Sequence, residues 1–97
     1  MKTIAILNPA SGAGNTGMKW DELQAKLLKA IPGMEIQTTD PHPGSAALLT
    51  RAALKNGAEK ILALGGDGTL SECLNGFFEN DEPVSPDAVF SFIMLGL

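Results

Sequence analysis

Cysteine, histidine and basic residues are scarce in this sequence of 97 residues, and each shortage excludes a class of protein. Its one cysteine, Cys73, excludes an intramolecular disulfide, and the leucines around it indicate a buried thiol on a helix. Its one histidine, His42, lies between two prolines without a partner at metal-ligand spacing, so we expect a solvated loop residue and no metal site. A formal net charge of −4 argues against a nucleic-acid-binding protein, which would normally carry a basic face.

Long apolar runs are missing as well. The run behind the first three residues extends only from Ile4 to Leu7, which fits a strand and not a signal peptide. No uninterrupted apolar run approaches the length needed to span a bilayer. We therefore expect a cytoplasmic protein that is at most peripheral to a membrane. The chain length allows one small domain with a modest core.

Short apolar runs alternate with helical periodicity along the chain. We expect strands at 3–7, 35–39, 60–64 and 88–95, helices at 18–31, 46–55 and 70–78, and a surface connection at 79–86. This order predicts the α/β class: a three-layer βαβαβαβ arrangement with a parallel sheet and helices on both faces. The loops after Leu7, Gln37 and Leu64 should then lie at one edge of the sheet. Ser45 is expected to cap the second helix.

The same periodicity predicts which side chains are buried. The last strand reads as largely buried, and Trp20 reads as a core residue. Packing against the sheet is expected of Ala47, Leu48, Ala52 and Leu54 in the second helix and of Leu70, Leu74, Phe77 and Phe78 in the third. The pair Asn75-Gly76 has poor helix propensity, so either the third helix ends early or the pair has a packing or ligand role.

The chain is organised around the stretch Leu64-Gly65-Gly66-Asp67-Gly68-Thr69-Leu70, which reads as strand, tight loop and helix. Glycine is needed where the backbone has positive φ or approaches a ligand without a Cβ in the way. The following helix directs its free N–H groups into the loop, which suits a phosphate. Asp67 would then need a cation or a transferable proton beside it, or could bond a ribose. A plain turn, with Asp67 or Thr69 capping the helix, is the alternative.

The first strand ends in Asn8-Pro9-Ala10-Ser11-Gly12, a loop of small residues that suits a phosphate. From Gly12 to Gly17 the sequence matches G-x-G-x-x-G, with Asp40 at a tolerable distance for a dinucleotide-binding fold. In that fold the first glycine directly follows the strand, whereas Asn8 to Ser11 intervene here. A Rossmann oxidoreductase is therefore a weaker hypothesis. Thr39, at the end of the second strand, is placed to offer a hydroxyl to a ligand.

The first loop, followed by Gly65-Gly66-Asp67-Gly68-Thr69-Leu70-Ser71-Glu72 and Asn75-Gly76, resembles the diacylglycerol kinase catalytic domain family. That family includes bacterial lipid kinases, sphingosine kinases and ceramide kinases. The resemblance covers essentially the whole chain. NAD kinases share the Gly-Gly-Asp-Gly loop but lack the Asn-Pro-x-Ser-Gly start, and they are the nearest alternative. A non-catalytic nucleotide-binding fragment is another.

The resemblance implies ATP-dependent phosphorylation of a lipid hydroxyl at a membrane surface, with Mg²⁺. Asp67 would be the catalytic residue, either as proton acceptor or within the metal and phosphate network. Nucleotide-binding or cleft-supporting roles are implied for Asn8, Pro9, Ser11, Gly12, Thr39, Gly65, Gly66, Asp67, Gly68, Thr69, Leu70, Ser71, Glu72 and Asn75.

Members of the family continue beyond the fourth strand into a Gly-Thr-x-Asn-Asp loop and a β-rich domain that forms much of the lipid site. Met94-Leu95-Gly96-Leu97 matches the start of that loop, with Leu97 where threonine is usual. We therefore expect residues 1–97 to be a single nucleotide-binding domain, truncated before the lipid domain and incomplete as a catalyst. The open last strand would invite formation of a homodimer.

Overall fold

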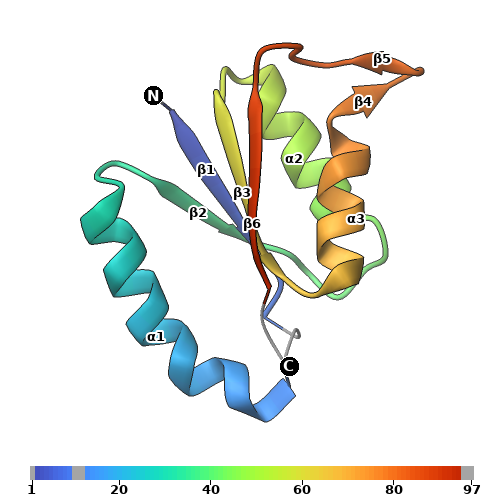
Figure 1. The fold of residues 1–97 in the computed structure, drawn as a ribbon. Helices are drawn as coiled ribbons and strands as arrows, with labels where there is room; N and C mark the ends of the chain where they lie inside the picture. The colour runs from blue at the N-terminus through green and yellow to red at the C-terminus, as the bar shows by residue number, and fades with distance from the viewer. Residues whose placement is uncertain (1, 10–12, 95–97) are drawn as a thin grey trace.

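The structure is a computed structural model that describes the backbone of residues 2–9 and 13–94, and their side chains except those of 13–21 and 94. Four parallel strands form the main sheet in the order β2-β1-β3-β6 (Figure 1). They are β1 (Thr3–Leu7), β2 (Glu35–Thr38), β3 (Lys60–Gly65) and β6 (Val89–Met94). After β1 the chain forms β2 on one side of β1, and it then crosses over β1 to form β3 on the other side. The boundary between β1 and β3 is thus a topological switch point, where open α/β sheets bind ligands.

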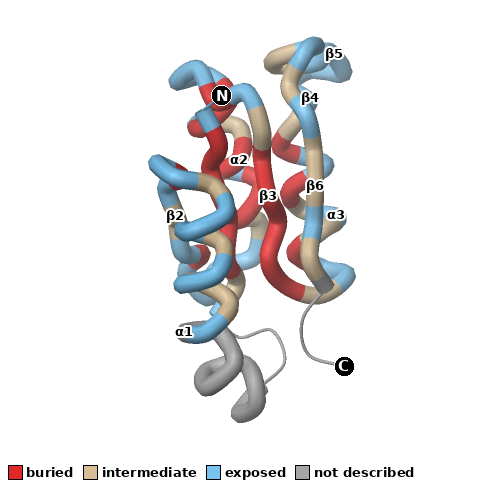
Figure 2. Tube along the Cα trace, turned by 60° about the vertical axis from the view of Figure 1, so that its left-hand side comes forward, coloured by how far each residue is buried: buried red, intermediate tan, exposed pale blue. Residues whose placement is uncertain are grey.

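Helices cover both faces of this sheet, as predicted. Helix α1 (Ala13–Ala30) lies on one face, and α2 (Ser45–Lys55) and α3 (Asp67–Gly76) lie side by side on the other (Figure 1). The central strand β1 is buried along its whole length and β3 is buried from Ile61 to Gly65, and Figure 2 shows this burial running along β3. Their continuous apolar runs are therefore explained, because a parallel sheet covered on both faces needs apolar side chains on both.

The side chains of the central strands divide into two cores. Ala5, Leu7, Leu62 and Leu64 face the α1 side, together with Met34. On the other side lie Ile4, Ile6, Ala46, Ala53, Leu54, Ala58, Ile61, Ala63 and Cys73. Cys73 has none of its surface exposed, which confirms the predicted buried thiol, and burial raises the pKa of that thiol.

Gly76 decides how closely α2 and α3 pack. A Cβ built on Gly76 would lie 2.6 Å from the carbonyl oxygen of Ala47 and 2.8 Å from the Cβ of Thr50. The helix also ends at this glycine. Both explanations offered for the Asn75-Gly76 pair therefore hold, since the helix ends there and the glycine lets the two helices touch.

Helix starts are the main difference from the sequence prediction. Helix α1 begins at Ala13 and not at Met18, so Gly14 and Gly17 lie within a helix and do not form a dinucleotide-binding turn. Helix α3 begins at Asp67 and not at Leu70. Both helix starts contain weak helix formers such as glycine and threonine, so the sequence pattern did not indicate them.

The predicted cap of the second helix is also wrong. The N-cap is Gly44, in the left-handed region at φ 88°, and it makes no side-chain cap. Ser45 is the first helical residue, and its hydroxyl accepts a hydrogen bond from the Asp40 N–H at 3.1 Å. A second, two-stranded sheet was not predicted: β4 (Phe78–Glu79) pairs with β5 (Glu82–Pro83) inside the connection to β6.

Several residues predicted to be buried are exposed. In α3 the buried residues are Thr69, Cys73 and Gly76, which recur at helical spacing, and the helix packs against α2 and the sheet. Contrary to the prediction, Leu48, Ala52, Leu74 and Phe78 are exposed. Strand β6 is an edge strand, so Val89 and Phe92 are 46% and 52% exposed and the prediction of a largely buried strand is wrong. The side chain of Trp20 lies outside the described residues.

Candidate functional site

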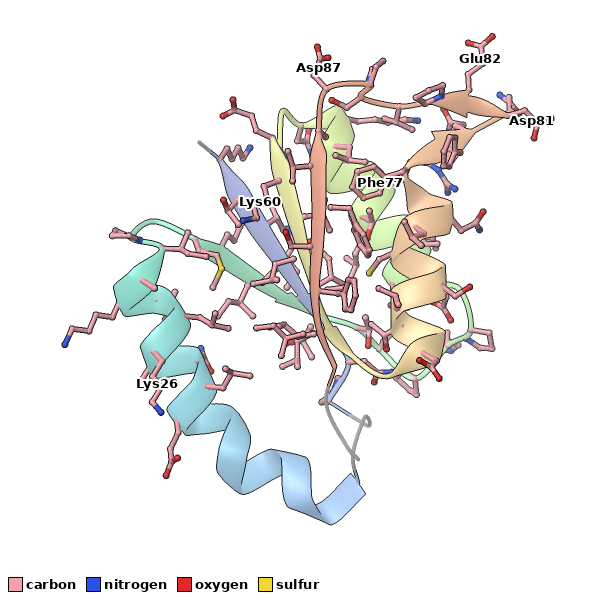
Figure 3. All side chains as sticks on the ribbon, in the orientation of Figure 1. Lys26, Lys60, Phe77, Asp81, Glu82 and Asp87 are labelled. Atoms are coloured by element: carbon pink, nitrogen blue, oxygen red, sulfur yellow. The ribbon has the colours of Figure 1, made fainter. Side chains whose placement is uncertain are left out.

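The loops after β1, β2 and β3 meet at one edge of the sheet, as the strand order predicts. They enclose an open groove of about 420 Å³ beside the N-termini of α2 and α3. Its walls are Asn8, Thr39, Asp40, Pro41, His42, Pro43, Ser45, Ala46, Gly66, Gly68, Thr69 and Glu72. The acidic residues Asp81, Glu82 and Asp87 lie at the opposite end of the molecule (Figure 3).

Asn8 joins the loop after β1 to the start of α3. Its backbone N–H donates to the Leu64 carbonyl at 3.0 Å, which continues the pairing of β1 with β3. Its side-chain Nδ2 donates to the hydroxyl oxygen of Thr69 at 3.0 Å. Thr69 is 4% exposed. Since the Thr69 oxygen accepts this bond, the hydroxyl proton of Thr69 is suited to donate toward a ligand in the groove.

Helix α3 begins at the groove without a side-chain cap. Its N-cap is Gly66, with φ −97° and ψ −167°, and the N–H of Leu70 makes a helical bond to the Gly66 carbonyl at 3.0 Å. The N–H groups of residues 67–69 have no carbonyl one turn earlier within the helix. The predicted alternative, in which Asp67 or Thr69 caps this helix, is therefore wrong.

Gly66 and Gly68 form part of the groove wall without a structural reason to be glycine. Neither has a positive φ, whereas Gly33, Gly44 and Gly57 do. A Cβ built on either Gly66 or Gly68 would meet no atom of the described residues within 4 Å. The fold alone would accept alanine at both positions, so the glycines leave open space at the start of α3.

The loop between β2 and α2 forms the opposite wall. The Thr39 N–H donates to the Leu7 carbonyl at 2.8 Å, and Thr39 is 8% exposed. Asp40 Oδ1 accepts from the His42 N–H at 2.9 Å and lies 3.2 Å from His42 Nδ1. The bond from the His42 N–H lowers the pKa of the Asp40 carboxyl below its usual range. His42 is exposed, as predicted.

Glu72 connects the two helices beside the groove. Its side chain projects from the second turn of α3, and its Oε1 accepts a hydrogen bond from the backbone N–H of Ala46 at 3.1 Å. Ala46 is the second residue of α2. A carboxylate from one helix thus caps the N-terminus of its neighbour, where it also opposes the positive end of the helix dipole.

Of the predicted site residues, the structure brings Asn8, Thr39, Gly66, Gly68, Thr69 and Glu72 together in the groove wall. Asp67 is exposed at the first position of α3, next to the wall but not part of it. The others in the described part of the chain lie outside the wall, namely Pro9, Gly65, Leu70, Ser71 and Asn75. Asn75 instead accepts a bond from Arg51 through its carbonyl. Ser11 and Gly12 lie outside the described residues.

Sequence reasoning missed the wall formed by residues 40–46. The signal was present, because this loop follows the carboxyl end of a strand, where ligands bind in open α/β sheets. Only Thr39, just before this loop, was selected as a site residue, and Asp40 was considered only for the weaker dinucleotide-binding hypothesis. Polar side chains that bond mainly to their own loop, such as Asp40 to His42, are hard to distinguish in a sequence from ordinary turn residues.

The wall of the groove contains two acids and no lysine or arginine among the described residues. Asp40 and Glu72 are the acids. Within 2–9 and 13–94 there is also no group of three or more histidine, cysteine, aspartate or glutamate side chains that could hold a metal ion. No helix in that part of the chain is long and apolar enough to cross a bilayer.

Comparison with known proteins gives this edge of the sheet a family context. The model of the diacylglycerol kinase catalytic domain matches residues 2–96. The chain belongs to the diacylglycerol kinase catalytic domain family. The resemblance drawn from the paired loops is thereby confirmed.

Individual relatives agree with this assignment. YtlR of Bacillus subtilis (strain 168), named as a candidate lipid kinase, is 31% identical over 94 residues, which are 94% of this chain and 28% of YtlR. A crystal structure of a diacylglycerol kinase from Bacillus anthracis (strain Sterne) has a TM-score of 0.77 and 26% identity, over 96% of this chain and 32% of its own. A second structure of a candidate diacylglycerol kinase from that strain has a TM-score of 0.78, with the same identity and coverage. The chain thus spans about a third or less of the length of these relatives.

Proposed function

We propose that residues 1–97 form the nucleotide-binding part of an ATP-dependent lipid kinase, and that the groove receives the phosphates of Mg-ATP. The observation that carries this proposal is the pair Gly66 and Gly68. Neither the backbone conformation of these residues nor their packing against the described part of the chain requires glycine there. Glycine at Gly68, inside a helix, costs roughly 0.5–1 kcal/mol relative to alanine. A phosphate that approaches the start of α3 closely would explain both residues.

Positioning is what the residues of this groove would supply to phosphoryl transfer. Amide N–H groups at the start of α3 and the Thr69 hydroxyl would hold phosphate oxygens, and Thr39 would contact the nucleotide from the end of β2. The described part of the wall offers donors but no lysine or arginine, so the positive charge that phosphates need fits a magnesium ion bound with the nucleotide. Asp67, at the start of α3, would act as proton acceptor or within the metal and phosphate network.

The acceptor in this proposal is a lipid hydroxyl presented at a membrane surface. Family membership supports it, and so do relatives named as lipid and diacylglycerol kinases. Because this chain covers only 28% and 32% of those relatives, transfer to a lipid would need more chain than residues 1–97.

We also propose a cytoplasmic location and a homodimer formed through the exposed edge of β6. Sedimentation of wild type and Phe92→Lys tests the dimer, which the substitution should disrupt.

The nucleotide site is tested by thermal denaturation of the 97-residue chain with Mg-ATP, Mg-ADP and NAD, for wild type, Gly68→Ala and Asp67→Ala. A ligand that binds only the folded state stabilises it by about 2.7 kcal/mol at a concentration of a hundred times its Kd. Wild type should therefore melt roughly 10–20 °C higher with saturating Mg-ATP. NAD should have no such effect.

Gly68→Ala separates the function of the glycine from its structural role. Without ligand this variant should melt at or above the temperature of wild type, because the added Cβ meets open space. With Mg-ATP its thermal shift should be lost. If Gly68→Ala keeps the full shift, the ligand does not approach this glycine. If wild type is folded and no nucleotide shifts it, the proposed function of these residues is wrong.

A further inference from the structure

Two helix N-termini face the groove, and either could attract a phosphate group. Ser45 and Ala46 bring the start of α2 into the wall, and Gly66, Gly68 and Thr69 bring the start of α3. Each helix start presents backbone N–H groups and the positive end of a helix dipole. A nucleotide that enters the groove therefore meets two competing anion sites unless the structure distinguishes them.

The first two N–H groups of α2, those of Ser45 and Ala46, are already bonded. The N–H of Ser45 donates to the His42 carbonyl at 3.2 Å, and the N–H of Ala46 donates to Glu72 Oε1 at 3.1 Å. The N–H of Leu48 makes the helical bond to the Gly44 carbonyl at 3.0 Å. A phosphate at this helix would have to displace a carboxylate and then lie beside its negative charge.

The start of α3 differs from the start of α2 in the groups that are bonded there. Its N-cap Gly66 provides no side-chain cap, and the Thr69 hydroxyl oxygen is bonded to a neutral amide, that of Asn8. The side chain of Asp67 is exposed and lies outside the groove wall. Among the described residues, no carboxylate is bonded to the amide groups at the start of α3, in contrast to the bond from Ala46 to Glu72 at α2.

Resting on the nucleotide site proposed above, we propose that Glu72 is a positioning residue that closes the N-terminus of α2 to anions and so directs the nucleotide phosphates to α3. The Glu72 carboxylate accepts the hydrogen bond from the Ala46 N–H that a phosphate oxygen would otherwise accept. It also fixes the distance between the two helix starts, because it projects from one and bonds the other. The two walls of the groove are then held at a defined separation before nucleotide arrives.

Inorganic phosphate is a suitable probe, because it needs no recognition of base or ribose. We would titrate it without metal into the ¹⁵N-labelled chain and follow the backbone amide resonances of Ala46, Gly68 and Thr69. In wild type the resonances of Gly68 and Thr69 should move while Ala46 stays unchanged. In Glu72→Ala the Ala46 resonance should also move and saturate. Glu72→Gln should respond in the same way more weakly, since a neutral carboxamide can still accept the bond but does not repel the anion.

Glu79→Ala is the matched control. It also removes one carboxylate, but Glu79 is bonded to Lys55 at 2.9 Å outside the groove wall, so the titration should repeat the wild-type result. The proposal is wrong if Ala46 moves in wild type at the same phosphate concentration as Gly68. It is equally wrong if Ala46 stays unchanged in every folded Glu72 variant. Should Gly68 and Thr69 never respond while Ala46 responds in Glu72→Ala, the role of Glu72 stands and the proposed nucleotide site fails.

Discussion

Gly76→Ala should destabilise the fold by about 1–3 kcal/mol, because it overfills the contact between α2 and α3. The new Cβ would lie 2.6 Å from the carbonyl oxygen of Ala47 and 2.8 Å from the Cβ of Thr50. Both neighbours are rigid: one is helix backbone, and Thr50 has none of its surface exposed. Neither can rotate away as the end of a long side chain would. The two helices must separate or slide, which disturbs the core beneath them.

Thermal and urea denaturation of the unliganded chain measure this effect. For a domain of this size each kcal/mol shifts the Tm by roughly 4–8 °C, so the Tm of Gly76→Ala should fall by about 4–24 °C. Gly68→Ala in the same helix is the control, and it should gain up to about 1 kcal/mol. If Gly76→Ala melts together with wild type, the close packing of α2 on α3 is wrong, and so is the explanation given for the Asn75-Gly76 pair.

Three further predictions concern charge. Asn8→Asp should leave stability nearly unchanged, because the Thr69 hydroxyl can donate to the new carboxylate, but calorimetric titration should show about tenfold weaker Mg-ATP binding, or ~1.4 kcal/mol. Burial raises the pKa of the Cys73 thiol, so its contribution to stability is complete below the ordinary thiol pKa and is lost as pH rises through the higher folded value. In thermal melts at alkaline pH, Cys73→Ala should be less stable than wild type but should lack this fall of stability with pH. The pKa of Asp40 is lowered, so its contribution is present above the ordinary aspartate pKa and is lost as pH falls through the folded value. Asp40→Asn should flatten that acid limb, and an unchanged limb would contradict the assignment.

The order of the elements and the edge at which the loops meet followed from the sequence. Continuous apolar runs such as Ile61 to Leu64 are typical of parallel strands covered on both faces, and each is separated from the next by a helical pattern. Parallel strands joined by helices direct all their carboxyl ends the same way, so the loops after Leu7, Gln37 and Leu64 had to converge. The paired motifs were specific enough to identify the family.

Helix boundaries and exposure could not be obtained in this way. The third helix begins in Asp67-Gly68-Thr69, residues of low helix propensity, and a register based on Leu70 and Leu74 placed the wrong side toward the core. The correct register uses Thr69, Cys73 and Gly76, and Gly76 must be small because α2 lies against it. That contact is tertiary, and hydrophobicity along the chain does not record it. The exposure of β6 likewise depends on its place at the edge of the sheet.

Glycine shows most clearly what the structure adds to the sequence. Gly33, Gly44 and Gly57 have positive φ, which explains them through the backbone alone. Gly76 has helix geometry but no room for a Cβ, so packing explains it. Gly66 and Gly68 satisfy neither condition, although in the sequence they look no different. The proposed phosphate, which would approach the backbone at the start of α3, explains them instead. The comparison of Gly68→Ala with Gly76→Ala tests this distinction. Gly68→Ala should weaken ligand binding without loss of stability, whereas Gly76→Ala should first of all lower the stability of the fold.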